Sequence, residues 1–318
     1  GLLDVPAGQW SERLCALAGV DDALLPPLVP AGETVGRVHA EAASRTGIPE
    51  GTPVVLGGGD THAGLVGLGA LEPGALGVVA GSTMPVMAVA AARAEDPDGR
   101  CWLSAHPAGG RWVVEANTGE AGTALDWMAD LFGVSVSRLG ALSAAAPAGA
   151  GGTRAVLGPA PVDWSNFPIL RRGVLSLPLP ASHTGIGRAE VARALVDNLA
   201  ISVRLARDWV AGVVPVPGPA RIGGRLARLR SFPEAVADAL GAPVLVASDP
   251  DVTLRGAAAA AAVAAGWHPT LDGAAAAIDT RLRTVEPTHA ELYEQLVKEW
   301  AAEVDGLGWV GLSALLPG

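Results

Sequence analysis

The sequence predicts an α/β fold with largely parallel sheets. Short apolar runs typical of buried strands alternate with amphipathic, helix-like segments in both halves of the 318 residues. Several of these runs end in glycine-bearing turns, at the edge where open α/β sheets bind ligands. Half of the residues are apolar and 17% are charged, so the chain has the composition of a globular protein with a sizeable core.

Charge, motifs and cysteine content argue against several classes of protein. The net charge of −10 leaves no basic stripe that could neutralise nucleic acid phosphates. Lys298 is the only lysine and no GxxxxGK[ST] motif occurs, so a P-loop is not expected. The longest apolar run, 256–267, is too short to span a membrane. Cys15 and Cys101 are isolated, which favours a reducing, cytoplasmic compartment.

The first 75 residues are predicted to hold short elements separated by loops. Apolar residues at helical spacing predict a helix over 9–18, and a second helix over 40–46 ends before a glycine. The proline-rich stretch 24–36 between them is predicted to be a loop. The apolar run 54–56 is predicted to be a buried parallel strand, and 61–68 a helix packed closely on the sheet.

The rest of the chain alternates strands and helices. Strands are predicted at 76–80, 84–90, 101–105, 111–115, 155–157, 173–177, 220–222 and 243–246. Helices are predicted at 120–132, 188–213, 233–240, 253–265 and 290–304. The strands between 84 and 115 are joined by Gly/Asp/Pro turns and predict an antiparallel meander. The low-complexity stretch 144–153 is predicted to be a linker or loop, as is the segment through Trp164 and Phe167.

Asp60 is the first candidate for catalysis. It follows the glycines 57–59 after an apolar run and comes directly before a predicted helix. This places one carboxylate at the carboxyl end of a strand and the start of a helix, where α/β proteins bind ligands. An alternative stays open at this point, because Asp60 could serve only as the N-cap of the helix.

Two further glycine turns follow predicted strands, Gly81-Ser82-Thr83 and Gly223-Gly224-Arg225. Backbone N–H groups that such turns leave free can cradle phosphate oxygens, and Ser and Thr hydroxyls add donors. A single turn of this kind is most often only a turn. Three in one α/β chain, one of them with a carboxylate, indicate a site for a nucleotide or a phosphate ester.

Other catalytic classes find less support. Asp60 and His62 could form a metal pair, but nothing nearby completes a ligand set and no HExxH motif occurs, so no metal ligand is predicted. Ser82 is not part of a GxSxG elbow, which argues against a hydrolase triad. The histidines are therefore expected to be surface or core residues.

The order of these turns resembles the carboxyl-terminal two thirds of the FGGY family of carbohydrate kinases, which contains xylulose, glycerol, gluconate and autoinducer-2 kinases. The stretches EAASRTGIPEGTPVVLGGGD and GLGALEPGALGVVAGST are similar to the family's approach to its catalytic aspartate and second phosphate loop. EANTGEAGTALDWMADLFG and GRAEVARALVDNLAISV look like the segment after the meander and the long helix of the carboxyl domain. RIGGRLARLRSFPEAVADALGAPVLV with RGAAAAAAVAAG is similar to the adenine-binding turn and the helix behind it.

The resemblance implies an actin-like, ribonuclease H-like two-domain kinase fold with its amino-terminal part missing. Residues 1–75 would be the tail of the amino-terminal sugar-binding domain, and 76–318 the carboxyl-terminal nucleotide-binding domain. The substrate and MgATP would bind in a cleft between the two. Asp60 falls on the family's general base, which takes the proton from the sugar hydroxyl that attacks the γ-phosphate.

The glycine turns would bind the nucleotide. Gly81, Ser82 and Thr83 fall on the loop that contacts the ATP phosphates. Gly223 and Gly224 fall on the adenosine loop that leads into Arg225, and Gly256 falls on the helix start beside it.

The implied function is ATP- and Mg²⁺-dependent phosphorylation of a sugar or polyol hydroxyl, on a ketose such as xylulose. An autoinducer-2 kinase-like enzyme and a non-catalytic sugar- or nucleotide-binding relative remain alternatives, since Gly81-Ser82-Thr83 stands where many members have Gly-Thr-Ser. The protein is expected to be cytoplasmic, with a small-molecule substrate, no nucleic acid or membrane partner, and a homodimer as one arrangement. Because the family's Asp-x-Gly-Thr/Ser loop belongs to the missing part, the chain alone is expected to have little or no kinase activity.

Overall fold

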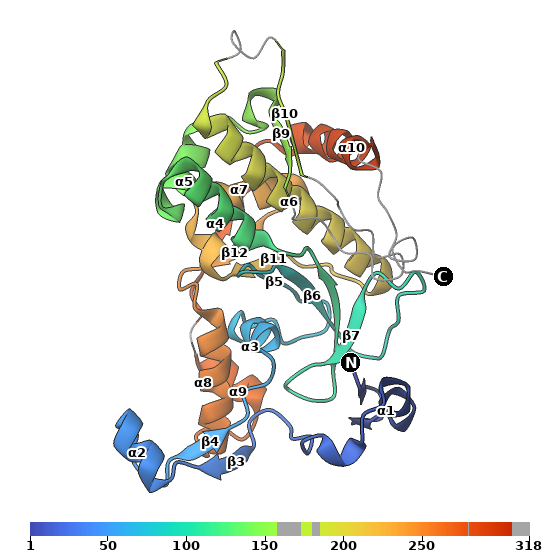
Figure 1. Ribbon diagram of the computed structural model, residues 1–318, viewed down its shortest axis with the longest axis vertical. Helices are drawn as coiled ribbons and strands as arrows, with labels where there is room; N and C mark the ends of the chain where they lie inside the picture. Colours follow the sequence, from blue (N-terminus) through green and yellow to red (C-terminus); the bar gives the residue numbers. More distant parts are fainter. Residues whose placement is uncertain (158–172, 180–184, 279, 307–318) are drawn as a thin grey trace.

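A seven-stranded mixed sheet forms the centre of the computed structural model, which describes residues 1–157, 173–179, 185–278 and 280–306 (Figure 1). The strand order is β13-β12-β11-β5-β6-β8-β7. The strands are β5 (Leu76–Val79), β6 (Pro85–Ala90), β7 (Trp102–Ala105), β8 (Trp112–Asn117), β11 (Ala220–Gly223), β12 (Val244–Ala247) and β13 (Leu282–Val285). Within this sheet β11 pairs in parallel with β5 and β12, and the other neighbours are antiparallel. The α/β class is confirmed, but the prediction of largely parallel sheets is wrong, because the hairpin-type connections around β6, β7 and β8 reverse the chain locally.

The strands between 84 and 115 are antiparallel, as predicted, but their order in space differs from a meander. β6 pairs directly with β8 from Pro85–Asn117 to Ala90–Trp112, and β7 lies outside β8 at the edge of the sheet. Burial explains this order. β6 is fully buried and β8 mostly so, whereas β7 carries an exposed tryptophan and half-buried residues that suit an edge position.

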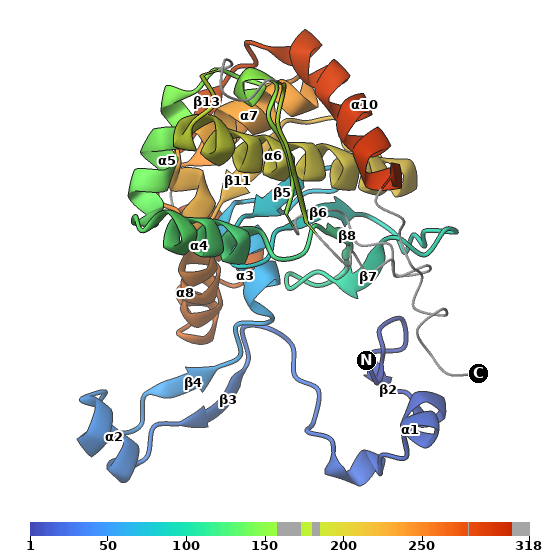
Figure 2. The same cartoon turned by 45° about the horizontal axis from the view of Figure 1, so that its top comes forward.

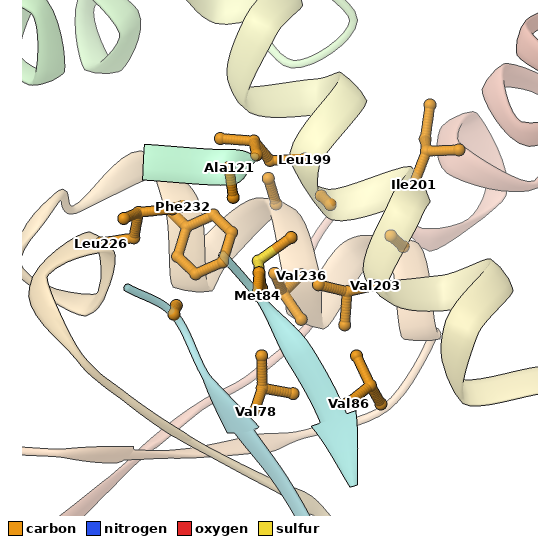
Figure 3. Close-up of a cluster of buried hydrophobic side chains, with 14 of the residues drawn as sticks. Val78, Met84, Val86, Ala121, Leu199, Ile201, Val203, Leu226, Phe232 and Val236 are labelled. Atoms are coloured by element: carbon orange, nitrogen blue, oxygen red, sulfur yellow. The ribbon is translucent and has the colours of Figure 1, made fainter. Parts of the chain in front are cut away.

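One face of the sheet packs against a layer of helices. The helices are α4 (Ala121–Phe132), α5 (Val136–Ala145), α6 (Arg188–Val213), α7 (Ser231–Leu240) and α10 (Ala290–Gly306). Figure 3 shows the contact between the layers, where Met84 and Phe232 lie between the strands and the helices with Val78 and Val86 below them. Alternate strand residues point to this face, as the two-residue period of a strand requires.

Residues 144–153 are only partly the loop that the sequence predicts. Helix α5, which was not predicted, extends to Ala145, and a 3₁₀ turn forms over Ala150–Gly152. Ser135 caps α5 by accepting a hydrogen bond from the Arg138 N–H at 3.2 Å. Small residues let this helix lie close to its neighbours, and an alanine-rich stretch is easily mistaken for a linker. A two-stranded sheet, β9 (Arg154–Val156) with β10 (Val174–Ser176), follows, and the loop predicted through Trp164 and Phe167 lies outside the described residues.

The opposite face of the sheet is covered by α3 (Asp60–Gly67) and α8 (Val252–Ala264), with α9 (Leu271–Ala277) beside α8 (Figure 1). Glycines bring α3 and α8 into backbone contact. A Cβ on Gly67 would lie 1.9 Å from the Val252 carbonyl oxygen, and one on Gly256 would lie 1.9 Å from the Ala63 carbonyl oxygen. Any side chain at either glycine would therefore push the two helices apart.

The first 56 residues lie apart from the helical layer, on the α3 side of the sheet (Figure 2). They form β1 (Leu3–Asp4), β2 (Gln9–Trp10), α1 (Glu12–Ala18), β3 (Thr34–Arg37), α2 (Ala40–Thr46) and β4 (Pro53–Val55). Both predicted helices are present, but the buried parallel strand predicted at 54–56 is wrong: β4 pairs antiparallel with β3, and Val54 is 44% exposed. β3 itself begins within the stretch predicted to be a loop. An apolar β-branched run indicates a strand but does not identify the partner.

Candidate active site

The two glycine turns after β5 and β11 are in direct contact. Because β5 and β11 are parallel neighbours, their carboxyl ends meet at the same edge of the sheet. The Ala80 N–H donates a hydrogen bond to the Gly223 carbonyl oxygen at 2.8 Å, and the Leu226 N–H donates to the Ala80 carbonyl oxygen at 3.2 Å. The predicted phosphate loop and the predicted adenosine loop therefore form one surface.

Gly224 makes this contact possible. Its φ of +94° is in a region that favours glycine, and a Cβ would lie 2.5 Å from the Ala80 carbonyl oxygen. Its N–H donates to the Pro250 carbonyl oxygen at 2.9 Å, which adds the loop after β12 to the same edge. Gly223 is also constrained, since a Cβ there would lie 2.6 Å from the Val252 side chain.

Asp60 is tied to this edge through α8. It is the first residue of α3, and its backbone carbonyl accepts a hydrogen bond from Thr253 Oγ1 at 3.3 Å, just after the Pro250 loop. The N-cap of α3 is Gly59, so the alternative that Asp60 is merely the N-cap does not hold. The side chain is exposed, and its Oδ1 accepts a hydrogen bond from the Thr61 N–H at 2.8 Å.

The loop of Gly81, Ser82 and Thr83 lies against the start of α4. The Gly122 N–H donates to the Ser82 carbonyl oxygen at 2.9 Å, and a Cβ on Gly122 would lie 2.4 Å from the Gly81 carbonyl oxygen. Ser82 and Thr83 are exposed, and within the described ranges neither hydroxyl has a hydrogen-bond partner. A helix start and two exposed hydroxyls make this loop suited to an anion.

Arg225 supplies positive charge beside that loop. Its guanidinium forms a half-exposed ion pair with Asp126 of α4 and would lie 2.6 Å from a Cβ on Gly122. The cation therefore lies over the start of α4, next to the loop that is predicted to hold phosphates. Its partner Asp126 offsets part of this charge.

Gly256 has a clear structural role. It lies in the second turn of α8 rather than at the helix start, and it faces the backbone of Ala63 in α3. This helix contact accounts for a glycine at the position. Its assignment to nucleotide binding stays a prediction.

Glu115 was not recognised from the sequence, although it lies near Asp60. It is only 6% exposed, and Asn117 Nδ2 donates to its Oε1 at 3.3 Å. Burial raises the pKa of Glu115, and the charge of Asp60 raises it further. A lone acid in the apolar run VVEAN was the signal that could have identified it.

His62 is the second residue that sequence reasoning did not assign to the site. Its Nε2 lies 2.7 Å from Ser104 Oγ on β7. Burial lowers the pKa of His62, and the charge of Asp60 offsets part of this effect. Asp60 thus has two titratable neighbours, one from its own helix and one from β8.

The described residues contain no group of three or more His, Cys, Asp and Glu side chains arranged to hold a metal ion. In the same part of the chain, no helix combines the length and apolar character that crossing a bilayer requires.

Comparison with known proteins shows which family the chain resembles. Residues 1–67 match the family model described as the N-terminal domain of the FGGY family of carbohydrate kinases. A xylulose kinase structure from Rhodospirillum rubrum superposes with a TM-score of 0.74 at 27% identity, over 96% of this chain and 62% of that one. The chain is thus similar to the FGGY carbohydrate kinases and shares the actin-like fold of their solved structures, and the predicted resemblance is confirmed.

The particular relatives differ in the substrates their names state. An autoinducer-2 kinase from Yersinia enterocolitica is 28% identical over 95% of this chain and 59% of its own length. The autoinducer-2 kinase of Escherichia coli strain K12 is 27% identical over 98% of this chain and 61% of its own length. A Plasmodium falciparum glycerol kinase with ADP shares the fold, with a TM-score of 0.75 at 16% identity, over 96% of this chain and 61% of that one. The chain spans about 60% of the length of these relatives.

Proposed function

We propose that this chain supplies the general base and the nucleotide-binding surface of a kinase that transfers the γ-phosphate of ATP to a hydroxyl of a sugar or polyol. The observation that carries the proposal is the direct contact of the loop 81–83 with the turn 223–225 at one edge of the sheet, with Asp60 linked to that edge through Thr253 of α8. Named kinases among the relatives support the same class of reaction.

Asp60 would accept the proton of the attacking hydroxyl. The acceptor oxygen then forms a bond to the γ-phosphorus, the bond from that phosphorus to the leaving ADP oxygen breaks, and the hydroxyl proton ends on the carboxylate. The Asp60 carboxylate is exposed in the first turn of α3, where a substrate hydroxyl can reach it. Phosphoryl transfer depends mostly on alignment and charge neutralisation, so little further covalent help is required.

The residues at the edge fit a nucleotide phosphate chain. Ser82 and Thr83 offer exposed hydroxyls, and Arg225 and the start of α4 add positive charge. Bound Mg²⁺ would neutralise phosphate charge, and we place it on the nucleotide rather than on a protein cluster. Adenosine would lie at the turn of Gly223 and Gly224, where Gly223 is buried and Gly224 is half-buried.

The names of the relatives suggest which hydroxyl compound accepts the phosphate. A ketose such as xylulose is the first candidate, because xylulose kinases are among the structures that share the fold. An autoinducer-2 kinase-like activity is the second, because the curated relatives that align over nearly all of this chain carry that name. A cytoplasmic location and a homodimer are further proposals that fit a small-molecule kinase.

The test is Asp60→Asn in a form of the protein that includes the amino-terminal part of the family fold. ATP-dependent phosphorylation is assayed with xylulose, glycerol, gluconate and autoinducer-2 as acceptors. We expect Asp60→Asn to lower kcat by a factor of about 100 or more, because the amide cannot take the proton. Asp130→Asn, an exposed acid at the far end of α4, is the matched control.

Retention of the activity within tenfold in Asp60→Asn would exclude Asp60 as the base. Nucleotide binding by calorimetry without any phosphoryl transfer would instead favour a non-catalytic relative. The 318-residue chain alone is expected to show little or no transfer, because it spans about 60% of the length of its relatives.

A further inference from the structure

We propose that His62 and Ser104 are positioning residues for Asp60: the hydrogen bond between them fixes the first turn of α3 against β7 and so sets the direction of the Asp60 carboxylate. This inference rests on the proposed function, in which Asp60 is the base. It concerns how the base is held rather than which reaction takes place.

The amino end of α3 needs such a restraint. Three glycines precede the helix, Gly58 has a φ of +88°, and the N-cap Gly59 offers no side chain to bond the free N–H groups of the first turn. Among the described residues, the Asp60 carboxylate accepts a hydrogen bond only from the neighbouring Thr61 N–H, through Oδ1. Nothing in the immediate sequence therefore holds this turn in one orientation.

Two contacts from distant elements restrain the turn. Thr253 Oγ1 of α8 donates to the Asp60 carbonyl oxygen at 3.3 Å, and Ser104 Oγ of β7 lies 2.7 Å from His62 Nε2. The two contacts come from separate elements, and they bond Asp60 and His62, the residues on either side of Thr61. The contact to β7 is the shorter one, and it is made by side chains alone.

The placement of Ser104 follows from the strand register. Ser104 lies opposite Val113 of β8, and Trp102 lies opposite Glu115. Because alternate residues point to the same face, Ser104, Val113 and Glu115 all face α3, where Val113 packs with Leu65. Ser104 is thus a polar side chain at the rim of an apolar face, at the height of the first turn of α3.

Two titratable groups interact with His62: Asp60 on its own helix and His106, which follows β7. Glu115 of β8 in turn interacts with Asp60. Burial lowers the pKa of His62 more than Asp60 raises it, so the imidazole is neutral at pH 7. A neutral ring has one donor and one acceptor nitrogen, and a serine hydroxyl can pair with either at Nε2.

The first test uses the 318-residue chain and needs no activity. The imidazole signals of His62 are followed by NMR as a function of pH, with hydrogen exchange of the Thr61 and His62 amides. Ser104→Ala is expected to shift the Nε2 signal and to speed exchange of both amides, while Ser104→Thr, which keeps the hydroxyl, leaves both near wild type. Ser137→Ala, at an exposed position on α5, is the control. The proposal is overturned if Ser104→Ala leaves the His62 signals and the exchange rates unchanged.

The second test measures catalysis in the form that includes the amino-terminal part. Ser104→Ala and His62→Ala are expected to lower kcat by about 10- to 100-fold with the KM for ATP within about twofold, since only the alignment of the base is lost. His62→Gln, which can still reach Ser104, should restore most of the rate. A purely structural role would lower the melting temperature and spare kcat, and that result overturns the proposal.

The two tests separate this inference from the proposed function. If no variant, including the wild type, phosphorylates any acceptor, the proposed function fails. The NMR and exchange data then still decide whether Ser104 holds the first turn of α3.

Discussion

His106 is a buried base beside the candidate site, and its protonation links the stability of the fold to pH. It is 2% exposed, and its Nδ1 accepts a hydrogen bond from the Ala108 N–H at 3.1 Å. Burial lowers its pKa from 6.5 to about 4. Between these values the unfolded chain binds a proton that the folded chain does not, so the free energy of unfolding falls as pH falls through this window.

We expect His106→Asn to flatten this pH dependence. Asparagine keeps an acceptor near the Ala108 N–H but cannot be protonated, so the variant should lose less stability than the wild type between pH 6.5 and pH 4, by about 3 kcal/mol at most. Urea denaturation at a series of pH values measures the difference. His39→Asn is the control, since His39 is exposed and also accepts a backbone N–H, from Ala42. Equal pH slopes in wild type and His106→Asn would show that His106 does not titrate in this way.

At the scale of residues, local sequence patterns predicted some residues of the candidate site but not others. Asp60 and the glycine turns stand out because glycine after an apolar run is a local pattern. Glu115 and the His62–Ser104 contact depend on the pairing of β7 with β8 and on the packing of α3, which no local pattern contains. These residues are recognised as neighbours only in the structure, because the sheet brings together residues that are about 40 to 55 positions apart in the chain.

At the scale of elements, the close packing of α3 on α8 holds Asp60 at the sheet edge. We expect Gly256→Ala to destabilise the fold by about 2–4 kcal/mol, because the new methyl would collide with the Ala63 backbone. Gly212→Ala is the matched control: Gly212 lies in α6 with open space around it, and alanine should stabilise that helix by about 0.5–1 kcal/mol. Both values come from urea denaturation of the chain.

This pair of variants also separates two roles for Gly256. If the glycine mainly contacts nucleotide, Gly256→Ala would unfold at the same urea concentration as the wild type and lose only ATP affinity. Loss of stability without bound nucleotide supports the packing role instead.

Helix α10 is held to α6 by a buried polar network. Arg193 Nε donates to Asp197 Oδ1 at 2.7 Å, the Tyr293 hydroxyl donates to the same oxygen, and the Gly149 N–H donates to Asp197 Oδ2 at 3.1 Å. Every group of this network has a partner, so its burial is tolerated. The network fixes the helical layer behind the sheet, on the side away from Asp60.

At the scale of the whole molecule, long periodic segments were the easiest to predict. The helices at 188–213 and 290–304 agree with α6 and α10 to within two residues, because an apolar stripe repeated over many turns is a strong signal. The short helices α5 and α9 and the edge strand β13 were missed, since short alanine-rich or charged segments carry little periodicity. The pairing of β4 with β3 was also missed, because strand partners are set by tertiary contacts.

The domain division predicted at residues 75 and 76 stays a prediction. Helix α3 lies before this boundary in the chain, yet it packs on β5 and α8 beyond it. The segment before α3 contributes a few elements on the α3 side of the sheet (Figure 2). These elements and α3 lie within residues 1–67, which match the N-terminal domain model of the FGGY family.

The central claim is that Asp60 and the glycine turns line the binding site of one nucleotide. Paramagnetic Mn²⁺ bound to ATP broadens NMR signals of nearby residues, so its position can be mapped on the isotope-labelled chain. We predict strong broadening of the amides of Ser82, Thr83, Gly224 and Thr61, and little effect at α2 and α10. Broadening of residues elsewhere, or of the glycine turns without the first turn of α3, would contradict the account.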